Sequence, residues 1–525
     1  MDKNKFIKFG NISKNLCLIL GYVVLIIGVI FFTIINNAVF FNSVAMKCIF
    51  AFGLLLFPAL LLNKKQNKTV NIISIILFLV CIGLFLYIVL DGLILDYFQP
   101  LSLSTLTSIL LIVGVVMLLI GGAISLFTKK GNITFATCTT LVVLMLSGLI
   151  WANTAVYKDF TNCEHTLLFN PNESGYATFR IPSIYAVDKN TLNNNGFNIA
   201  SDPLYAFCEG RINSSHDKGD IDIVYKYSTD SGNTWSEVKT LLTFGDEVGK
   251  YGNPTVVFNK HTGSFHLFYM KASSNDNYHY KSYHSLLKIK EDFSLSIDNN
   301  STKDISLTLD ANNEKGGSDG VRSDTLMVGP GKGAYIENGK YTGRIVMPCS
   351  NNGHSFVVYS DDDGITWNNL ATSNEVKSAG FGNECEATFV NDKLVMVVRE
   401  NRGCSTFHSK QFQRFSISND GGATWQEKTI DSTLKSPICM SSVATYNNKL
   451  ILTYPDDFFT RANLSLAISD GNVSFNTLPL YSGATGYSCV TVDSDNNIFV
   501  LAEIGKINYN ENLVFIKVDT SKLQK

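Results

Sequence analysis

The chain lacks an excess of charge of either sign. Its 525 residues include 43 Lys and Arg and 45 Asp and Glu, for a formal net charge of −2. Proteins that bind nucleic acid through bulk charge carry a strong basic excess, so no nucleic-acid partner is expected. Charged residues are also scarce, at 17%, whereas hydrophobic residues reach 46%. Such a composition excludes a disordered chain and predicts that part of it lies in a bilayer.

The cysteines lack the spacing of a metal site. There are 11 of them, with neither a CxxC pair nor a Cys/His pattern, so no zinc or other metal is expected. Four lie in apolar runs, where they act as small apolar residues. Seven follow residue 151: Cys163, Cys208, Cys349, Cys385, Cys404, Cys439 and Cys489. This odd number leaves room for one or two disulfides without indicating which.

Long apolar runs fill the first 151 residues and are missing after them. Five runs approach the ~20 residues that cross a bilayer. They are Leu16 to Ile35, Val44 to Leu62, Val70 to Leu90, Thr105 to Phe127 and Ile133 to Trp151. Soluble helices alternate polar and apolar faces, and these runs do not. We therefore predict an α-helical transmembrane region of about five spans over residues 1–151. Charges inside the runs are nearly absent, which favours an anchor over a transporter.

Basic residues set the expected orientation, because lysines flanking spans stay on the cytoplasmic side. They precede the first span and lie in the second and fourth loops: Lys3, Lys5, Lys8, Lys14, Lys64, Lys65, Lys68, Lys129 and Lys130. The other two loops have none. The pattern predicts a multi-pass cell-membrane protein with a cytoplasmic N-terminus, a linker over residues 152–162 and an extracellular domain over 163–525. Loss of one span would invert this orientation.

A repeated motif dominates the outer part. Ser228 to Trp235, Ser360 to Trp367 and Ser418 to Trp425 all read Ser-x-Asp-x-Gly-x-Thr-Trp, and each follows an alternating apolar stretch typical of a strand. Ile468 to Phe475 looks like a decayed fourth copy. Asp and Ser can bind nearby backbone N–H groups and Gly can take positive φ, so we interpret the motif as a hairpin turn. The Trp is expected to plug the turn against its own sheet.

Repetition argues against a catalytic role for these aspartates, because an active site is single. Repeated four-stranded units with few helices are typical of a β-propeller. At roughly 60 residues per unit, the outer region holds about six blades. The predicted fold is therefore an all-β six-bladed β-propeller catalytic domain preceded by the transmembrane region.

The repeats resemble the Asp boxes of sialidases, and further segments of the chain fall in the order of that family. Tyr176 to Ser183 contains Phe-Arg-Ile-Pro and is similar to the motif that opens the sialidase catalytic domain. The other matching segments are Ala206 to Arg211, Asp217 to Asp222, Gly382 to Glu386, Val397 to Arg399, Arg461 to Leu464, Gly486 to Ser488 and Val500 to Glu503. Gly329 to Gly333 is similar to a structural turn of the family.

This resemblance implies a site. Arg180, Arg399 and Arg461 would bind the sialic acid carboxylate, which suits the planar fork of guanidinium groups. Arg211 would lie beside them on another substrate oxygen. Glu503 would orient Arg180 from behind. No metal or organic cofactor is implied.

The resemblance also implies the chemistry. Sialidases attack with a tyrosine, because a carboxylate approaching a carbon that already bears a carboxylate would be repelled. Tyr487 would be the nucleophile, Glu384 its base and Asp217 the acid/base. Glu386 lies two residues from Glu384 on a predicted strand and thus on the same face, so a shared or exchanged role stays open.

The expected function is hydrolysis of terminal sialic acids from glycoproteins, glycolipids or oligosaccharides, with retention through a covalent tyrosyl intermediate. Membrane lipid would surround the spans. A trans-sialidase, including an intramolecular one, is an alternative, and so is a non-catalytic sialic-acid-binding adhesin. The joint presence of Asp217, Glu384 and Tyr487 argues against the adhesin. Between Lys281 and Asp319 the sequence departs from the family, since the expected Asp box is missing.

Overall fold

The computed structural model describes residues 160–524. Within this range, the description leaves out residues 218, 246, 274–279, 307–326, 352–353, 370–381, 401–411, 430–433, 458–460, 470–473 and 506–507. The chain divides into two units, Met1–Tyr157 and Lys158–Lys525. The five predicted spans lie outside the described residues. Within the described part, no helix is both long and apolar enough to cross a membrane.

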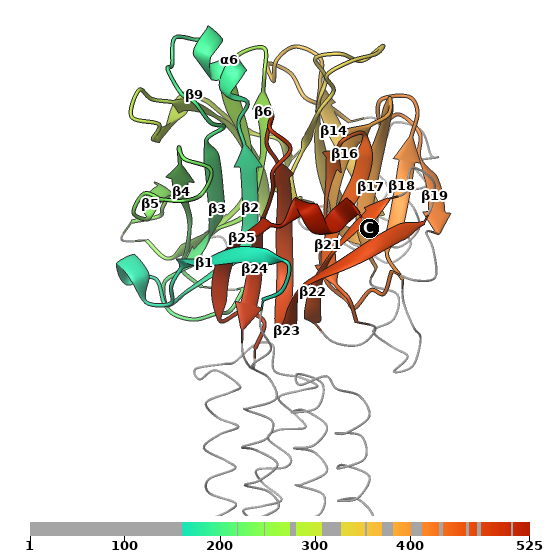
Figure 1. Ribbon diagram of the computed structural model, residues 1–525. Helices are drawn as coiled ribbons and strands as arrows, with labels where there is room; N and C mark the ends of the chain where they lie inside the picture. Colours follow the sequence, from blue (N-terminus) through green and yellow to red (C-terminus); the bar gives the residue numbers. More distant parts are fainter. Residues whose placement is uncertain are drawn as a thin grey trace, which may run out of the picture. The chain divides into compact units, whose positions relative to one another are not determined.

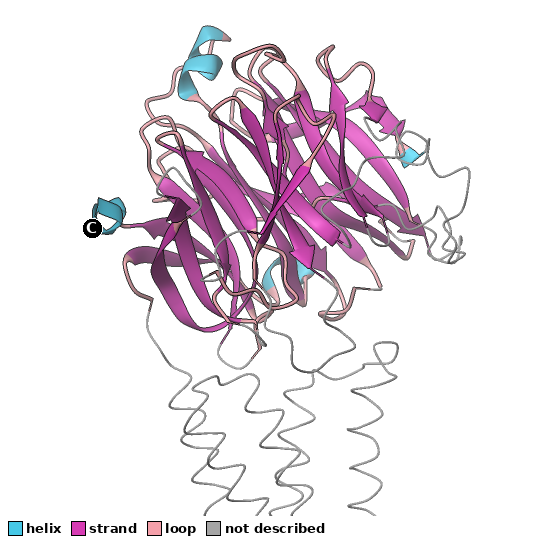
Figure 2. Ribbon diagram, turned by 90° about the vertical axis from the view of Figure 1, so that its right-hand side faces the viewer, coloured by secondary structure: helices cyan, strands magenta, loops and turns pink. Residues whose placement is uncertain are grey.

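The described part is built from β-strands, which confirms the all-β prediction for the outer region. Figure 2 shows strands throughout this part, with helix confined to short pieces at its margins. One is α6 (Lys189–Asn194), whose N-cap Asp188 accepts from the backbone N–H of Asn190. Two others are 3₁₀ turns, Glu173–Gly175 and Thr520–Gln524.

The strands of the described residues form four sheets. One has nine strands, in the order β2-β3-β4-β6-β7-β8-β9 with β5 on β4 and β11 on β6. A second has the order β10-β13-β14-β15 with β12 on β13, a third β16-β17-β18-β19, and the fourth β1-β25-β24-β23-β22-β21-β20.

The bounds of the strands are as follows. They are β1 (Cys163–Phe169), β2 (Thr178–Ala186), β3 (Leu204–Arg211), β4 (Ile221–Ser228), β5 (Lys239–Leu242), β6 (Gly249–Asn259), β7 (Ser264–Ser273), β8 (Lys281–Ile289), β9 (Leu295–Asp304), β10 (Met327–Val328), β11 (Gly331–Lys332), β12 (Ala334–Tyr335), β13 (Ile345–Asn351), β14 (His354–Ser360), β15 (Asn368–Asn369), β16 (Gly382–Val390), β17 (Lys393–Glu400), β18 (Arg414–Ser418), β19 (Gln426–Thr429), β20 (Ser442–Tyr446), β21 (Lys449–Pro455), β22 (Ala462–Ser469), β23 (Phe475–Val492), β24 (Ile498–Gly505) and β25 (Asn512–Val518).

Antiparallel meanders of consecutive strands repeat along the described part, and the first strand closes onto the last. Within each meander, each strand pairs with the next along the chain. In contrast, β1 pairs with β25, in a register that joins Cys163 to Val518 (Figure 1). This pairing ties the two ends of the outer unit into one sheet. The hairpin β8–β9 forms without an Asp box, in the segment where the sequence departs from the family pattern.

The repeated Asp motif forms a hairpin turn, as predicted. In the first copy, the Asp230 carboxylate accepts from the Ser228 hydroxyl at 2.7 Å, from the Thr234 backbone N–H at 2.9 Å and from the Thr234 hydroxyl at 2.7 Å. Gly232 has a φ of +82° and donates its N–H to Ser228 Oγ at 2.9 Å. The copies at Asp362 and Asp420 have the same bonds.

Two tryptophans of the motif contact a neighbouring sheet, whereas each was expected to plug the turn against its own sheet. The Trp235 ring meets Phe515 of β25 with centroids 5.0 Å apart, and Trp367 meets Phe268 of β7 at 4.6 Å. Both partners belong to a different sheet from the turn itself. Trp367 thus packs on a strand that precedes its own sheet in the chain, and Trp235 packs on the last strand of the chain.

The cysteines of the described part form no disulfide. Cys163, Cys208, Cys349, Cys385, Cys439 and Cys489 are all free thiols, and five of them are buried. Burial raises the pKa of each of these buried thiols above its usual value. Among these six, the disulfides left open by the sequence are absent, and the thiols pack as small apolar side chains.

The hydrogen bonds of the Asp230 turn are expected to make a measurable contribution to the free energy of unfolding. Replacing Asp230 with Ala removes three bonds to its carboxylate, and we expect the free energy of unfolding to fall by about 1–2 kcal/mol. Urea denaturation measures this. The control is Glu237→Ala in the following segment, because Glu237 is exposed and only its backbone oxygen accepts a hydrogen bond. Equal unfolding midpoints for the two variants would contradict the turn's contribution.

Candidate active site

Irregular strand pairing marks the place where the predicted site residues meet. Register shifts interrupt β2 between Arg180 and Ser183, β16 between Gly382 and Cys385, and β23 between Thr485 and Ser488. The same occurs in β6 and at the start of β22. A bulge turns the strand locally and can aim a side chain out of its ordinary alternation. Arg180, Glu384 and Tyr487 each lie within or beside such a bulge.

Tyr487 and Glu384 form the centre of the site. The Tyr487 hydroxyl donates to Glu384 Oε2 at 2.5 Å, and Arg399 Nη1 donates to both Tyr487 Oη, at 2.5 Å, and Glu384 Oε2. Both Tyr487 and Glu384 are buried. Burial raises the pKa of Tyr487 well above its usual value, although the Arg399 charge acts in the opposite direction. The phenol is therefore protonated and shares its proton with a carboxylate.

Three guanidinium groups surround the Tyr487 ring. The Cζ atoms of Arg180 and Arg399 each lie 5.9 Å from the ring centroid, and that of Arg461 lies at 5.3 Å. Such contacts are within the range of cation–π attraction. The structure thus brings together the three arginines predicted to bind a carboxylate, although they come from β2, β17 and the residue before β22.

Glu503 pairs with Arg180, the residue that it was predicted to orient. Its carboxylate accepts from Arg180 Nε at 3.0 Å and from Arg180 Nη2 at 3.4 Å. It also accepts from the backbone N–H groups of Ile181 and Tyr487, both at 3.1 Å. Glu503 is fully buried. A Cβ on Gly486 would lie 2.2 Å from Glu503 Oε2, so the glycine makes room for this carboxylate.

Asp217 lies at the open side of the site, on the loop between β3 and β4. Its side chain is 74% exposed, and Oδ1 accepts from Arg211 Nη2 at 2.8 Å and from Arg180 Nη1 at 3.3 Å. Desolvation acts to raise the pKa of Asp217, but the charges of Arg211 and Arg180 outweigh it and hold the pKa well below its usual range. In this state, Asp217 accepts from Nη1, the Arg180 nitrogen that does not donate to Glu503.

The site keeps cationic groups available for an anion. Arg399 Nε is buried and has no hydrogen-bond partner among the described residues. Arg461 donates Nε and Nη2 to the carbonyl of Ile438, at 3.1 and 3.0 Å, and pairs with no carboxylate in the described part of the chain. A half-buried guanidinium that pairs with no described carboxylate favours an anion as its partner, because partly desolvated charge is costly to leave unpaired.

Glu386 does not share the site, which answers the question that the sequence left open. It is fully buried and accepts from Lys332 Nζ at 2.7 Å, from Ser442 Oγ at 2.6 Å and from the Val443 backbone N–H at 3.2 Å. Glu384 lies within the register shift between Gly382 and Cys385, whereas Glu386 lies beyond it, in regular pairing with Val397. Gly331, in the turn predicted to be structural, lies against it, since a Cβ there would approach Glu386 Oε2 to 2.1 Å.

Two residues of the site carry no role in the sequence analysis. Tyr509 lies between β24 and β25 and faces two of the arginines. Its ring centroid is 4.7 Å from Arg461 Cζ and 5.6 Å from Arg180 Cζ. Glu209 pairs with Arg211 beneath Asp217. Alternation along β3 could have identified Glu209, because positions 209 and 211 share one face. Tyr509 lies in a loop, where no periodic signal exists.

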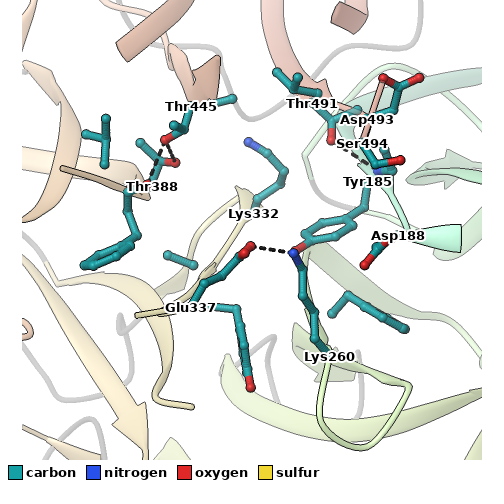
Figure 3. A pocket seen from close by; sticks show the side chains of 18 of the residues that line it. Tyr185, Asp188, Lys260, Lys332, Glu337, Thr388, Thr445, Thr491, Asp493 and Ser494 are labelled. Carbon is teal, nitrogen blue, oxygen red and sulfur yellow. Dashed lines mark hydrogen bonds and ion pairs between the residues drawn. The ribbon is translucent and has the colours of Figure 1, made fainter. Parts of the chain in front are cut away.

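A separate cavity of about 790 Å³ lies toward the other end of the same strands. Figure 3 shows Lys332 and Tyr185 in it, with the Lys260–Glu337 ion pair at 2.5 Å and hydroxyl groups such as Thr388 and Thr445. None of the predicted site residues lines it. Lys332 and Glu386 lie between the two regions, because Lys332 lines the cavity and Glu386 follows Glu384 along β16.

Comparisons with known proteins agree with this architecture. Residues 202–500, more than half of the chain, match the family model described as a BNR repeat-like domain. The chain belongs to this BNR repeat-like family. Curated relatives include a sialidase of Bacteroides fragilis, 25% identical over 367 residues, covering 62% of this chain and 60% of the relative. Another is sialidase-3 of Rattus norvegicus, 25% identical over 303 residues, covering 55% and 68%. A third, the sialidase of Paraclostridium sordellii, is covered over 61% of its length.

Solved structures show the fold. A Hadza microbial sialidase superposes with a TM-score of 0.52 at 19% identity, covering 66% of this chain and 67% of that chain. A leech intramolecular trans-sialidase gives 0.51 at 18% identity, covering 72% of each chain. A sialidase of Trypanosoma rangeli gives 0.51 at 19% identity, covering 68% and 59%. The outer unit therefore has the β-propeller fold of these proteins.

The close packing at Gly486 predicts the effect of a single methyl group. In Gly486→Ala, the new Cβ would displace Glu503 and the Tyr509 ring, whose Cδ2 would lie 2.7 Å away. We expect the unfolding free energy to fall by about 1–3 kcal/mol. Adding Glu503→Asp shortens the displaced side chain, so the double variant should recover part of the loss in thermal unfolding. An unchanged melting temperature for Gly486→Ala would show that Glu503 does not lie beneath this position.

Proposed function

We propose that the outer unit is an exo-α-sialidase that removes terminal sialic acids from glycoconjugates. The observation that carries this proposal is the buried Tyr487 phenol bonded to Glu384 within a ring of three guanidinium groups. A sialic acid presents a carboxylate on the carbon to be attacked, and guanidinium groups match a carboxylate. The resemblance to curated sialidases supports the same activity.

The first step is attack by Tyr487 Oη on the anomeric carbon. Glu384 takes the phenol proton as the new bond forms, and Asp217 gives a proton to the glycosidic oxygen, which leaves as an alcohol. A neutral phenol can approach a carbon that bears a carboxylate, and this is the reason for a tyrosine nucleophile in sialidases. The 2.5 Å bond between Tyr487 and Glu384 already provides the path for the proton.

Substrate binding prepares Asp217 for its role. In the ligand-free site, Asp217 is ionised because Arg211 and Arg180 hold its pKa low. A carboxylate that binds Arg180 competes with Asp217 for the same guanidinium and adds a negative charge nearby. Both effects raise the pKa of Asp217 and favour its protonated form. In the second step, Asp217 takes a proton from water and the water oxygen attacks the anomeric carbon of the tyrosyl intermediate. The bond from this carbon to Tyr487 Oη breaks, Glu384 returns its proton to the phenolate, and the product keeps its original anomeric configuration.

The architecture that holds this site is a six-bladed propeller in our proposal. The nine-stranded sheet contains two successive meanders, β2–β5 and β6–β9, and the seven-stranded sheet contains two more, which share the 18-residue strand β23. Adding the sheets of β13–β15 and β16–β19 supports six units. The register shifts within β23 fit a strand that passes from one unit to the next.

Intramolecular transfer is the second candidate. Two of the similar solved structures are intramolecular trans-sialidases, one from leech and one from Ruminococcus gnavus. Transfer and hydrolysis share the tyrosyl intermediate and differ in the group that attacks it. The products distinguish them, because hydrolysis gives free sialic acid and intramolecular transfer gives an anhydro sugar.

Removal of one hydroxyl tests the proposal. In purified full-length protein, we expect turnover of a fluorogenic aryl sialoside, and we expect Tyr487→Phe to reduce kcat by at least about 100-fold. Tyr454→Phe is the matched control, because Tyr454 is equally buried and its hydroxyl lies 3.3 Å from Thr477 Oγ1. Binding of sialic acid without turnover by the wild type would instead support an adhesin.

We further propose that residues 1–151 anchor the enzyme in the cell membrane by about five spans, with the N-terminus in the cytoplasm and the propeller outside. The apolar runs and the placement of the lysines support this arrangement. Such an anchor would keep the site near sialylated glycans outside the cell.

Protease protection tests the anchor. The full-length chain with a C-terminal epitope should stay in the membrane fraction after an alkaline wash, because apolar spans are not extracted by pH. Protease added to intact cells should remove the epitope. Extraction by the alkaline wash would contradict the anchor, and an epitope protected until the membrane is opened would contradict the orientation.

A further inference from the structure

Glu209 is a buried carboxylate that the chemistry above does not use. It lies on β3, where it is fully buried, two residues before Arg211, which is 1% exposed. Both of its oxygens are fixed. Arg211 Nε and Nη2 donate to Oε2 at 3.0 and 2.6 Å, and the backbone N–H of Asn253 donates to Oε1 at 3.0 Å. A Cβ on Gly252 would lie 2.8 Å from Oε1, so this glycine leaves the space that Glu209 fills.

Arg211 links this buried carboxylate to the loop that carries Asp217. Its Nη2 also donates to Asp217 Oδ1 at 2.8 Å, and its Nη1 donates to the carbonyl of Ser215. The guanidinium therefore holds the loop at two points. All three of its nitrogens have partners within the protein. This geometry favours a role beneath Asp217 over the substrate contact that the resemblance implied.

The charges around Asp217 come from three strands. Arg180 faces it from β2, and Arg211 from β3. Lys250 on β6 donates to the Asp217 carbonyl at 3.1 Å. These cations keep the pKa of Asp217 low and outweigh the desolvation that acts to raise it. Glu209 is the buried anion of this group and offsets the charge of Arg211. Without it, Asp217 would hold a proton even less readily.

We propose that Glu209 is a positioning residue for the reaction, which acts through Arg211 to hold the Asp217 loop and to offset the cationic charge beside this acid. The inference rests on the sialidase function proposed above. It predicts that loss of Glu209 impairs protonation of the leaving group, because that is the step Asp217 performs when the glycosidic bond breaks.

The dependence on the leaving group separates this role from a merely structural one. An aryl sialoside releases a stabilised phenolate and needs little help from an acid, whereas sialyllactose releases an alkoxide and needs a proton. We expect Glu209→Gln to lower kcat/KM for sialyllactose by at least about tenfold and for the aryl sialoside by less than about threefold. The ratio kcat/KM reports the first chemical step and excludes hydrolysis of the intermediate.

Three further variants extend the test. Asp217→Asn should show the same selectivity, and the double variant with Glu209→Gln should lose no more on sialyllactose than Asp217→Asn alone, since both act on one step. Glu386→Gln is the matched control, because Glu386 is equally buried and pairs with Lys332 away from Asp217. Any loss in this control should be equal for the two substrates.

The pH profile gives a second readout. Because Glu209→Gln removes a negative charge, the pKa of Asp217 falls, and activity on sialyllactose should decline at a lower pH than in the wild type. If Glu209→Gln does not fold, Arg211→Lys tests the same contact, because Lys keeps the charge but loses the bidentate pairing. It should show the same selectivity for the leaving group.

The outcomes separate the two claims. A folded wild type that releases sialic acid from neither substrate overturns the proposed function, and the inference with it. An active wild type whose Glu209→Gln variant loses both substrates equally, with an unchanged pH profile, overturns the inference alone. Selective loss on sialyllactose with additive effects in the double variant also overturns it, because Glu209 would then act independently of Asp217.

Discussion

The site depends on the mutual neutralisation of buried charge around one phenol. Three guanidinium groups lie within 6 Å of the Tyr487 ring, and such a cluster would repel itself without counter-ions. Glu503 neutralises Arg180 from within the protein, and Glu384 neutralises Arg399. Arg461 keeps a positive charge that no described carboxylate pairs. This remaining positive charge favours an anionic ligand at the site.

Bulges that interrupt the regular pairing of the strands help to place the residues of this cluster. Strand alternation would place residues two positions apart on one face, and that rule suggested a common site for Glu384 and Glu386. The bulge at Gly382 to Cys385 assigns Glu384 to the site and Glu386 to the buried Lys332 pair. Bulges beside Arg180 and Tyr487 act in the same way. The Asp turns serve the scaffold instead, because their Trp side chains join one sheet to the next.

The sequence predicted the β-strands, the turn role of the repeated aspartates and the residues that meet around Tyr487. These features leave local signals, namely alternation, a repeated turn and a matching order of motifs. The contacts between distant segments of the propeller leave no such local signal in the sequence. The packing of Trp235 on Phe515, the approach of Tyr509 to Arg461 and the Glu209–Arg211–Asp217 chain join segments that only the folded chain brings together. The absence of disulfides among the described cysteines likewise follows from packing, since spacing alone left pairing open.

The most direct test of this account identifies the atom that attacks the sugar. A fluorinated sialosyl fluoride retains a good leaving group but slows hydrolysis of the intermediate, so the covalent enzyme accumulates. Peptide mapping of the treated full-length protein by mass spectrometry should place the added sialosyl mass on Tyr487, and Tyr487→Phe should stay unlabelled. A label on Glu384 or Asp217, or turnover of this reagent without any covalent adduct, would contradict the assignment of Tyr487 as the nucleophile.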